Sequence, residues 1–207
     1  MLKKELLLIA AMCSLFTLNA QIKNNLKLTI EPGVLLLSDS DNLGIFLYAE
    51  PKLKVSKNAF FGLRIGLTLN PQSYEIHDRA QFKINERDDN GGVSFVPTID
   101  YYFKGNNYRP YVGGGVGAYL LSSYIDVTQV VSGGLSDNEY EVFVNNQVGL
   151  LLRAGFESKK SRLGLEYNFI SKADIEIPNG PVMGSVDNSY LGLTIGFVIG
   201  GEKRYRG

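Results

Sequence analysis

The single histidine of the chain, His77, is the side chain best suited to acid–base chemistry near neutral pH. Ser73 lies before it and Asp78 follows it directly. A serine hydroxyl becomes a strong nucleophile when an imidazole takes its proton, which requires the groups to lie within hydrogen-bond reach. All three residues share one polar loop, and a loop does not by itself establish that geometry. We therefore expect His77 to be a surface histidine, and we assign no catalytic residue.

Other kinds of chemical site find little support in the residues. One cysteine and one histidine exclude cysteine-based zinc sites and histidine-pair metal sites. The glycines at 113–117 are not followed by the lysine and hydroxyl residue of a phosphate-binding loop, and 88–90 lacks the ligand spacing of a calcium loop. The 21 basic residues balance 21 acidic ones without a basic cluster, which argues against nucleic-acid binding. We expect no metal and no cofactor.

The first 20 residues have the pattern of a secretory signal peptide. Lys3 and Lys4 precede an apolar stretch, 6–18, that is too short to span a bilayer as a helix, and Ala20 offers a cleavage point. Removal of this segment also removes Cys13, which suits an oxidising compartment. We expect residues 1–20 to be removed and residues 21–207 to form a single domain.

The rest of the chain alternates between apolar and polar or small residues in segments typical of β-strands. In the segment 162–171, for example, Leu163, Leu165 and Tyr167 alternate with Arg162 and Glu166. The predicted strands are approximately 26–37, 44–55, 60–70, 93–104, 109–121, 141–156, 162–171 and 190–199.

The links between these strands alternate between short polar turns and longer loops, at 72–92, 122–140 and 172–189. This layout predicts an eight-stranded antiparallel up-and-down barrel in an outer membrane, with the short turns on the periplasmic side. Pro32, Pro51, Pro97 and Pro110 conflict with it, because each removes a ladder donor from a barrel that has no free edge.

Within the predicted strands, the charged residues fall on the face opposite the continuous apolar face. A membrane barrel turns its apolar face to lipid and its polar face inward, and eight strands leave an interior that side chains fill. A soluble lipocalin-like barrel would instead line its interior with apolar side chains. We expect ion pairs in the lumen among Glu31, Glu50, Lys52, Arg64, Asp100, Arg153 and Glu166.

Aromatic residues cluster towards the predicted strand ends, as in the aromatic girdles of membrane barrels. Phe61, Tyr101, Phe103 and Phe156 lie towards the short turns, and Phe169 and Tyr190 lie towards the long loops. We expect these six residues at the lipid interfaces.

Two neighbouring segments, 96–103 (VPTIDYYF) and 108–117 (YRPYVGGGVG), resemble small outer-membrane β-barrel proteins of the porin-like OmpW/OmpA-like superfamily, of the type common in Bacteroidota. The end of the last strand, 190–197, resembles the signal read by the barrel-assembly machinery, although residues 198–207 continue beyond it. The resemblance implies a barrel in the outer membrane of a Gram-negative bacterium. It implies no substrate, because this superfamily is functionally mixed.

These observations favour a non-enzymatic role in envelope integrity or surface interaction. The expected partners are outer-membrane lipid, lipopolysaccharide, the assembly machinery and a surface partner of the three long loops. One alternative is OmpW-like passage of small apolar solutes through the barrel wall, which would need an apolar upper lumen formed by Leu35, Leu37, Phe143 and Leu151. A second alternative is a lipid-modifying enzyme, which loss of His77 should inactivate.

Overall fold

A computed structural model describes much of the chain. The described residues are 25–38, 43–70, 75–76, 82–84, 90–105, 107–122, 126–131, 134–141, 143–144, 146–176 and 182–201. The predicted signal peptide, His77, Ser73 and Asp78 lie outside them. In this part of the chain no helix is long and apolar enough to cross a membrane.

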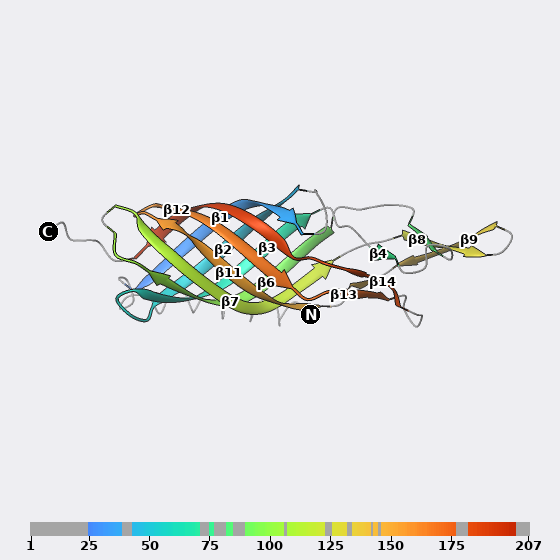
Figure 1. The fold of residues 1–207 in the computed structure, drawn as a ribbon, viewed down its shortest axis with the longest axis horizontal. Coiled ribbons are helices and arrows are strands. Elements are labelled where there is room, and N and C mark those ends of the chain that lie inside the picture. The colour runs from blue at the N-terminus through green and yellow to red at the C-terminus, as the bar shows by residue number, and fades with distance from the viewer. Residues whose placement is uncertain are drawn as a thin grey trace, which may run out of the picture.

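Eight long strands of the described chain form a closed antiparallel barrel, which confirms the predicted fold (Figure 1). Each pairs with its neighbours in sequence among the long strands, and the first pairs with the last. They are β1 (Leu26–Leu37), β2 (Leu43–Lys54), β3 (Ala59–Asn70), β6 (Asn90–Tyr102), β7 (Arg109–Ser122), β11 (Gln147–Glu157), β12 (Ser161–Ile170) and β15 (Tyr190–Gly200).

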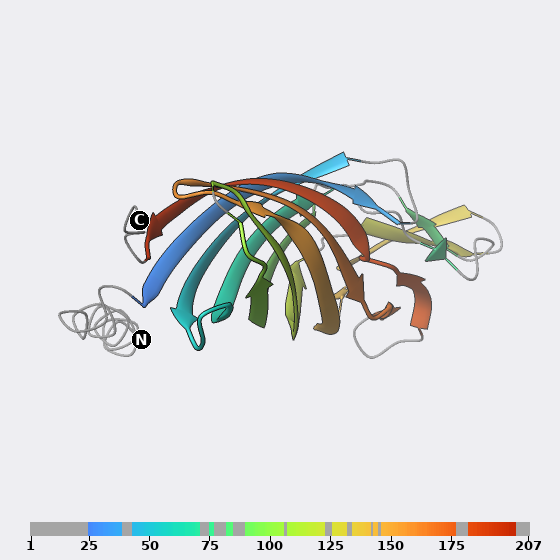
Figure 2. The same ribbon diagram turned by 60° about the vertical axis from the view of Figure 1, so that its left-hand side comes forward.

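Shorter strands extend the long-loop end beyond the barrel, as Figure 2 shows from a second direction. The sequence predicted loops there, except for residues 143–144, which fall within the predicted strand 141–156. One small sheet has the order β10 (Phe143–Val144), β13 (Ala173–Glu176), β14 (Val182–Val186) and β4 (Glu75–Ile76). Another has the order β5 (Phe82–Ile84), β8 (Asp126–Val131) and β9 (Gly134–Glu141).

Side chains alternate between lumen and exterior along every barrel strand, as the period of an extended chain requires. In β12 the buried and exposed positions follow one another from Ser161 to Ile170. Each barrel strand turns large apolar side chains outward, for example Leu36, Leu63 and Ile195, which are 41%, 40% and 61% exposed. An apolar exterior around a closed ladder is the form that a bilayer demands.

The prolines are accommodated by interrupting the pairing on one side of their strand while keeping it on the other. Pro51 stands opposite Leu28 of β1, and the pairing of β2 with β3 pauses there and resumes in the same register. Pro97 stands opposite Leu63 of β3, and the pairing of β6 with β7 pauses in the same way. The missing N–H of each proline therefore interrupts the strand pairing locally and leaves the register unchanged.

Candidate functional site

The half of the lumen nearest the short turns, here called the lower lumen, contains a network of buried ion pairs. Arg153 of β11 is its centre: its two terminal nitrogens donate to the Glu50 carboxylate at 2.6 and 2.8 Å, and its Nε donates to Asp100 at 2.8 Å. Lys52 lies 2.6 Å from Asp100 and 3.1 Å from Glu50. Such two-pronged guanidinium contacts are among the strongest polar interactions in proteins.

Arg162 of β12 carries the network towards the short turns. It donates to Asp100 at 3.0 Å and to the Tyr102 hydroxyl at 2.6 Å. Its Nε lies 3.2 Å from a Glu31 oxygen as an ion pair, although neither atom has hydrogen-bond geometry. The guanidinium also stacks on the Tyr111 ring at 3.6 Å. The side chain therefore links strands on different sides of the barrel.

A second group lies above this centre and closes the lower lumen towards the long loops. Arg64 pairs with Glu166 and lies over the Tyr48 ring at 3.4 Å. Glu166 accepts from the amide of Asn168, which in turn accepts from the Tyr119 hydroxyl. These bonds connect the charged half of the lumen to the apolar half.

All seven residues that the sequence placed in the lumen lie there, at most 5% exposed. The network also contains three charged residues that the sequence analysis did not include, Lys27, Glu157 and Arg162. Arg162 has the same parity as Glu166, and Lys27 has the same parity as Glu31. The alternation could therefore have predicted that both residues face the lumen. Glu157 lies at the very end of β11, where parity is a weak guide.

Glycines on the inner face make room for this network. A Cβ atom at Gly62 would lie 2.7 Å from a Glu50 carboxylate oxygen, and one at Gly113 would overlap Asp100. A close approach of this kind is a physical reason for glycine in a strand.

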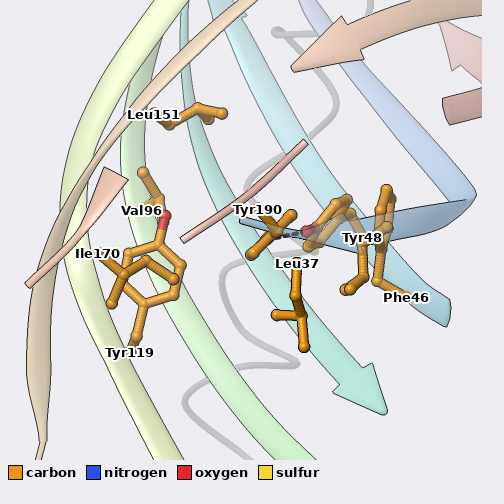
Figure 3. Packing of buried hydrophobic residues seen from close by; sticks show 9 residues of the cluster. Leu37, Phe46, Tyr48, Val96, Tyr119, Leu151, Ile170 and Tyr190 are labelled. Atoms are coloured by element: carbon orange, nitrogen blue, oxygen red, sulfur yellow. Dashed lines mark hydrogen bonds between the residues drawn. The ribbon is translucent and has the colours of Figure 1, made fainter. Parts of the chain in front are cut away.

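The other half, the upper lumen, is apolar and aromatic. Its buried cluster is Leu35, Leu37, Phe46, Tyr48, Val96, Tyr119, Leu151, Ile170 and Tyr190. Figure 3 shows these side chains reaching inward from different walls of the barrel, with a hydrogen bond between the Tyr48 and Tyr190 hydroxyls. Phe46 stacks on Tyr48 with ring centroids 4.4 Å apart. The side chain of Phe143 is not among those described.

Five of the six aromatic residues expected at the lipid interfaces are on the exterior, between 45% and 53% exposed: Phe61, Tyr101, Phe103, Phe156 and Phe169. The sixth assignment was wrong. Tyr190 is 3% exposed and lies in the upper lumen. Its height on the strand suggested a girdle, but its parity in β15 turns it inward beside Tyr48.

At the long-loop end, Ser171 presents an exposed side chain just beyond β12. Its backbone is held by β11, because its N–H donates to the Val148 carbonyl at 3.0 Å and its carbonyl accepts from the Gln147 amide at 2.6 Å. Gln147 is itself held by Asn188 at 3.1 Å.

Two other serines at this end already use their hydroxyls within the barrel. Ser38 bonds the Tyr167 hydroxyl at 2.7 Å, and Ser189 donates to the Ile170 carbonyl at 3.2 Å. For Ser171, no hydroxyl bond is found within the described residues. This part of the chain also contains no histidine, since His77 lies outside it, and no cluster of metal-ligating side chains.

A family model for lipid A 3-O-deacylase (PagL) matches residues 59–182, which is more than half of the chain. The chain belongs to the PagL family. The matched segment contains five barrel strands, from β3 to β12, with the loops between them, and it includes His77. No curated protein sequence matches the chain.

Solved structures share the fold at low sequence identity. The outer membrane enzyme PagL has a TM-score of 0.50 at 12% identity, over 83% of this chain and 98% of that one. OprG from Pseudomonas aeruginosa has a TM-score of 0.49 at 13% identity, over 87% of this chain and 98% of that one. Neisserial surface protein A has a TM-score of 0.47 at 14% identity, over 84% of this chain and 95% of that one. At this level of identity the similarity to the PagL structure shows a shared barrel fold alone.

Membership of the PagL family corrects the expectation that the protein is not an enzyme. That expectation rested on the weak case for a triad in one loop around His77. The family match extends over several strands and points to an enzyme family. A search for catalytic residues close together in sequence could not find this relationship, because a barrel brings distant strands together.

Proposed function

We propose that the protein hydrolyses an acyl ester of lipid A in the outer leaflet of the outer membrane. The observation that carries the proposal is the match of residues 59–182 to the lipid A 3-O-deacylase family. The apolar exterior supports it, because it would hold the barrel among the acyl chains of the substrate. The long loops 72–92, 122–140 and 172–189 would contact the headgroup of lipopolysaccharide.

Ester hydrolysis of this kind needs a hydroxyl nucleophile and a general base. We assign Ser171 as the nucleophile. It is exposed at the long-loop end, next to the lipid-facing Phe169, and its backbone is fixed by two strong hydrogen bonds. A nucleophile that is held beside a barrel strand at this end would meet its substrate in a fixed orientation.

We assign His77 as the general base, since it is the one imidazole in the sequence. The backbone topology places the segment before His77 at the same end of the barrel as Ser171. β4 directly precedes His77 and pairs with β14, which pairs with β13, and β13 begins close after Ser171. The segment before His77 therefore joins the small sheet that begins beside the proposed nucleophile.

The test is mass spectrometry of lipid A incubated with the folded protein in mixed micelles. We expect the loss of one acyl chain, and a rate at least about 100-fold lower in Ser171→Ala and in His77→Ala. Ser158→Ala is the matched control, because Ser158 lies in a turn at the opposite end, and it should keep full activity. Gel mobility of unboiled samples verifies that each variant is folded.

Unchanged lipid A after incubation with the folded wild-type protein would refute the hydrolase. Full activity of Ser171→Ala would refute the assignment of that serine alone.

A second candidate function, OmpW-like passage of small apolar solutes, is favoured by the apolar upper lumen. Leu35 and Leu151, at 1% and 0% exposure, contribute to it as that function requires. Because these side chains fill the space, passage would require them to move aside. Uptake of an alkane by vesicles containing the protein tests this function, and uptake no faster than in empty vesicles would exclude it.

A further inference from the structure

A cavity of about 440 Å³ lies below the lower lumen, at the short-turn end of the barrel. Its lining comes from β2, β3, β7, β11 and β15 and from the turn between β11 and β12, so the cavity is the mouth of the barrel. Cavities of this volume are within the range of small-molecule sites.

Basic side chains dominate this mouth. Lys54, Arg109, Lys159 and Lys160 line it from three parts of the chain. Arg109 is held in place, because its Nε donates to the Phe103 carbonyl at 3.4 Å and its guanidinium lies over the Tyr102 ring at 5.1 Å. Its terminal nitrogens are the part of the side chain suited to a planar or tetrahedral oxyanion.

The acidic residue of the lining, Glu157, is already neutralised from inside the barrel. Lys27 lies 2.7 Å from one of its oxygens and Arg162 lies 3.1 Å from the other. The Tyr102 hydroxyl also donates to it at 2.7 Å. The charges of Arg109, Lys159 and Lys160 are therefore not balanced by this carboxylate, and their field extends into the cavity.

The floor of the mouth is closed. Lys27 lies over the rings of Phe60 and Tyr102 at 4.2 and 4.1 Å, and Arg162 above them is 1% exposed. An anion drawn into the mouth would stop there, because the filled lower lumen offers it no way through. The mouth has the form of a binding pocket.

We propose that the mouth of the barrel binds an oxyanion of the phosphate type at the periplasmic side. The phosphate could belong to a small soluble molecule or to a phospholipid headgroup of the inner leaflet, which share the same chemistry. This site lies at the opposite end of the barrel from Ser171 and does not depend on the hydrolase proposal.

The test is titration calorimetry of the folded protein in a neutral maltoside detergent, with sodium pyrophosphate as the soluble probe. A second arm uses neutral-detergent micelles containing phosphatidylglycerol, with phosphatidylcholine as the reference. We expect binding of one probe that weakens about tenfold in the double variant Lys159→Gln/Lys160→Gln, because two nearby charges are lost. Arg109→Gln should weaken it in the same direction.

The matched control is Lys57→Gln/Lys104→Gln. It removes the same charge from exposed lysines near the same end that do not line the mouth. Unchanged binding in this control supports the site. Equal weakening in both double variants, or no binding of either probe by the wild-type protein, overturns it. Binding of pyrophosphate identifies a soluble ligand, and binding of phosphatidylglycerol alone identifies the headgroup.

Discussion

In the lower lumen, side chains such as Arg153 and Asp100 are held by ion pairs, whereas in the upper lumen side chains such as Leu151 and Phe46 are held by apolar and ring contacts. Both sets of side chains are buried within the same eight-stranded barrel. The lower half obtains definite geometry from directional bonds between distant strands. The upper half relies mainly on close packing, with few such bonds, among them the one between the Tyr48 and Tyr190 hydroxyls. It lies nearest the end where the proposed chemistry takes place.

We expect the largest loss of stability when the ion-pair network of the lower lumen is broken at its centre. Arg153→Leu removes the two-pronged partner of the Glu50 carboxylate and one of the three cations around Asp100. Removing one partner of a buried ion pair costs about 3 to 5 kcal/mol. We expect this loss in the free energy of unfolding, measured by urea titration in detergent. Arg153→Lys keeps the charge and should lose less. Unchanged stability of the leucine variant would show that the network does not hold the barrel.

A smaller effect is expected from opening space in the upper lumen. Leu151→Ala creates a cavity in the buried cluster, with a cost of about 2 to 4 kcal/mol in the same measurement. Leu152→Ala is the matched control: the adjacent residue is 49% exposed on the lipid-facing side and should change stability much less. Equal losses in the two variants would mean that the upper lumen is not packed as a core.

The smallest effect tests the one polar link within the upper cluster that joins β2 to β15. Tyr190→Phe removes the hydrogen bond between the Tyr48 and Tyr190 hydroxyls and leaves the ring packing. The expected loss is about 1 kcal/mol in the free energy of unfolding. Tyr108→Phe, at a residue 66% exposed, should lose nothing. A loss as large as that of Leu151→Ala would indicate that the upper half also depends on directional bonds.

The alternation of residues was enough to predict the strands, the closed barrel and the inward charges, because side-chain direction in a strand depends only on parity. It could not pair Arg153 with Asp100, because that contact depends on the register of strands far apart in sequence. Tyr190 was assigned to the wrong face because the assignment followed its position near the strand end and not its parity along the strand. The way in which the strands accommodate proline could not be predicted either, because it depends on the hydrogen-bond pairing on both sides of each strand.

The pairing of β1 with β15 has a consequence for how the chain is made. The seam joins Lys27 to Gly200 and Leu37 to Tyr190, so its two sides are the first and the last barrel strands to be synthesised. Until β15 arrives, an incomplete sheet exposes two unpaired edges that invite aggregation. Closure is therefore expected to be a late, slow step of maturation, because it joins the most distant parts of the sequence. A nascent chain would need protection from its own edges throughout export.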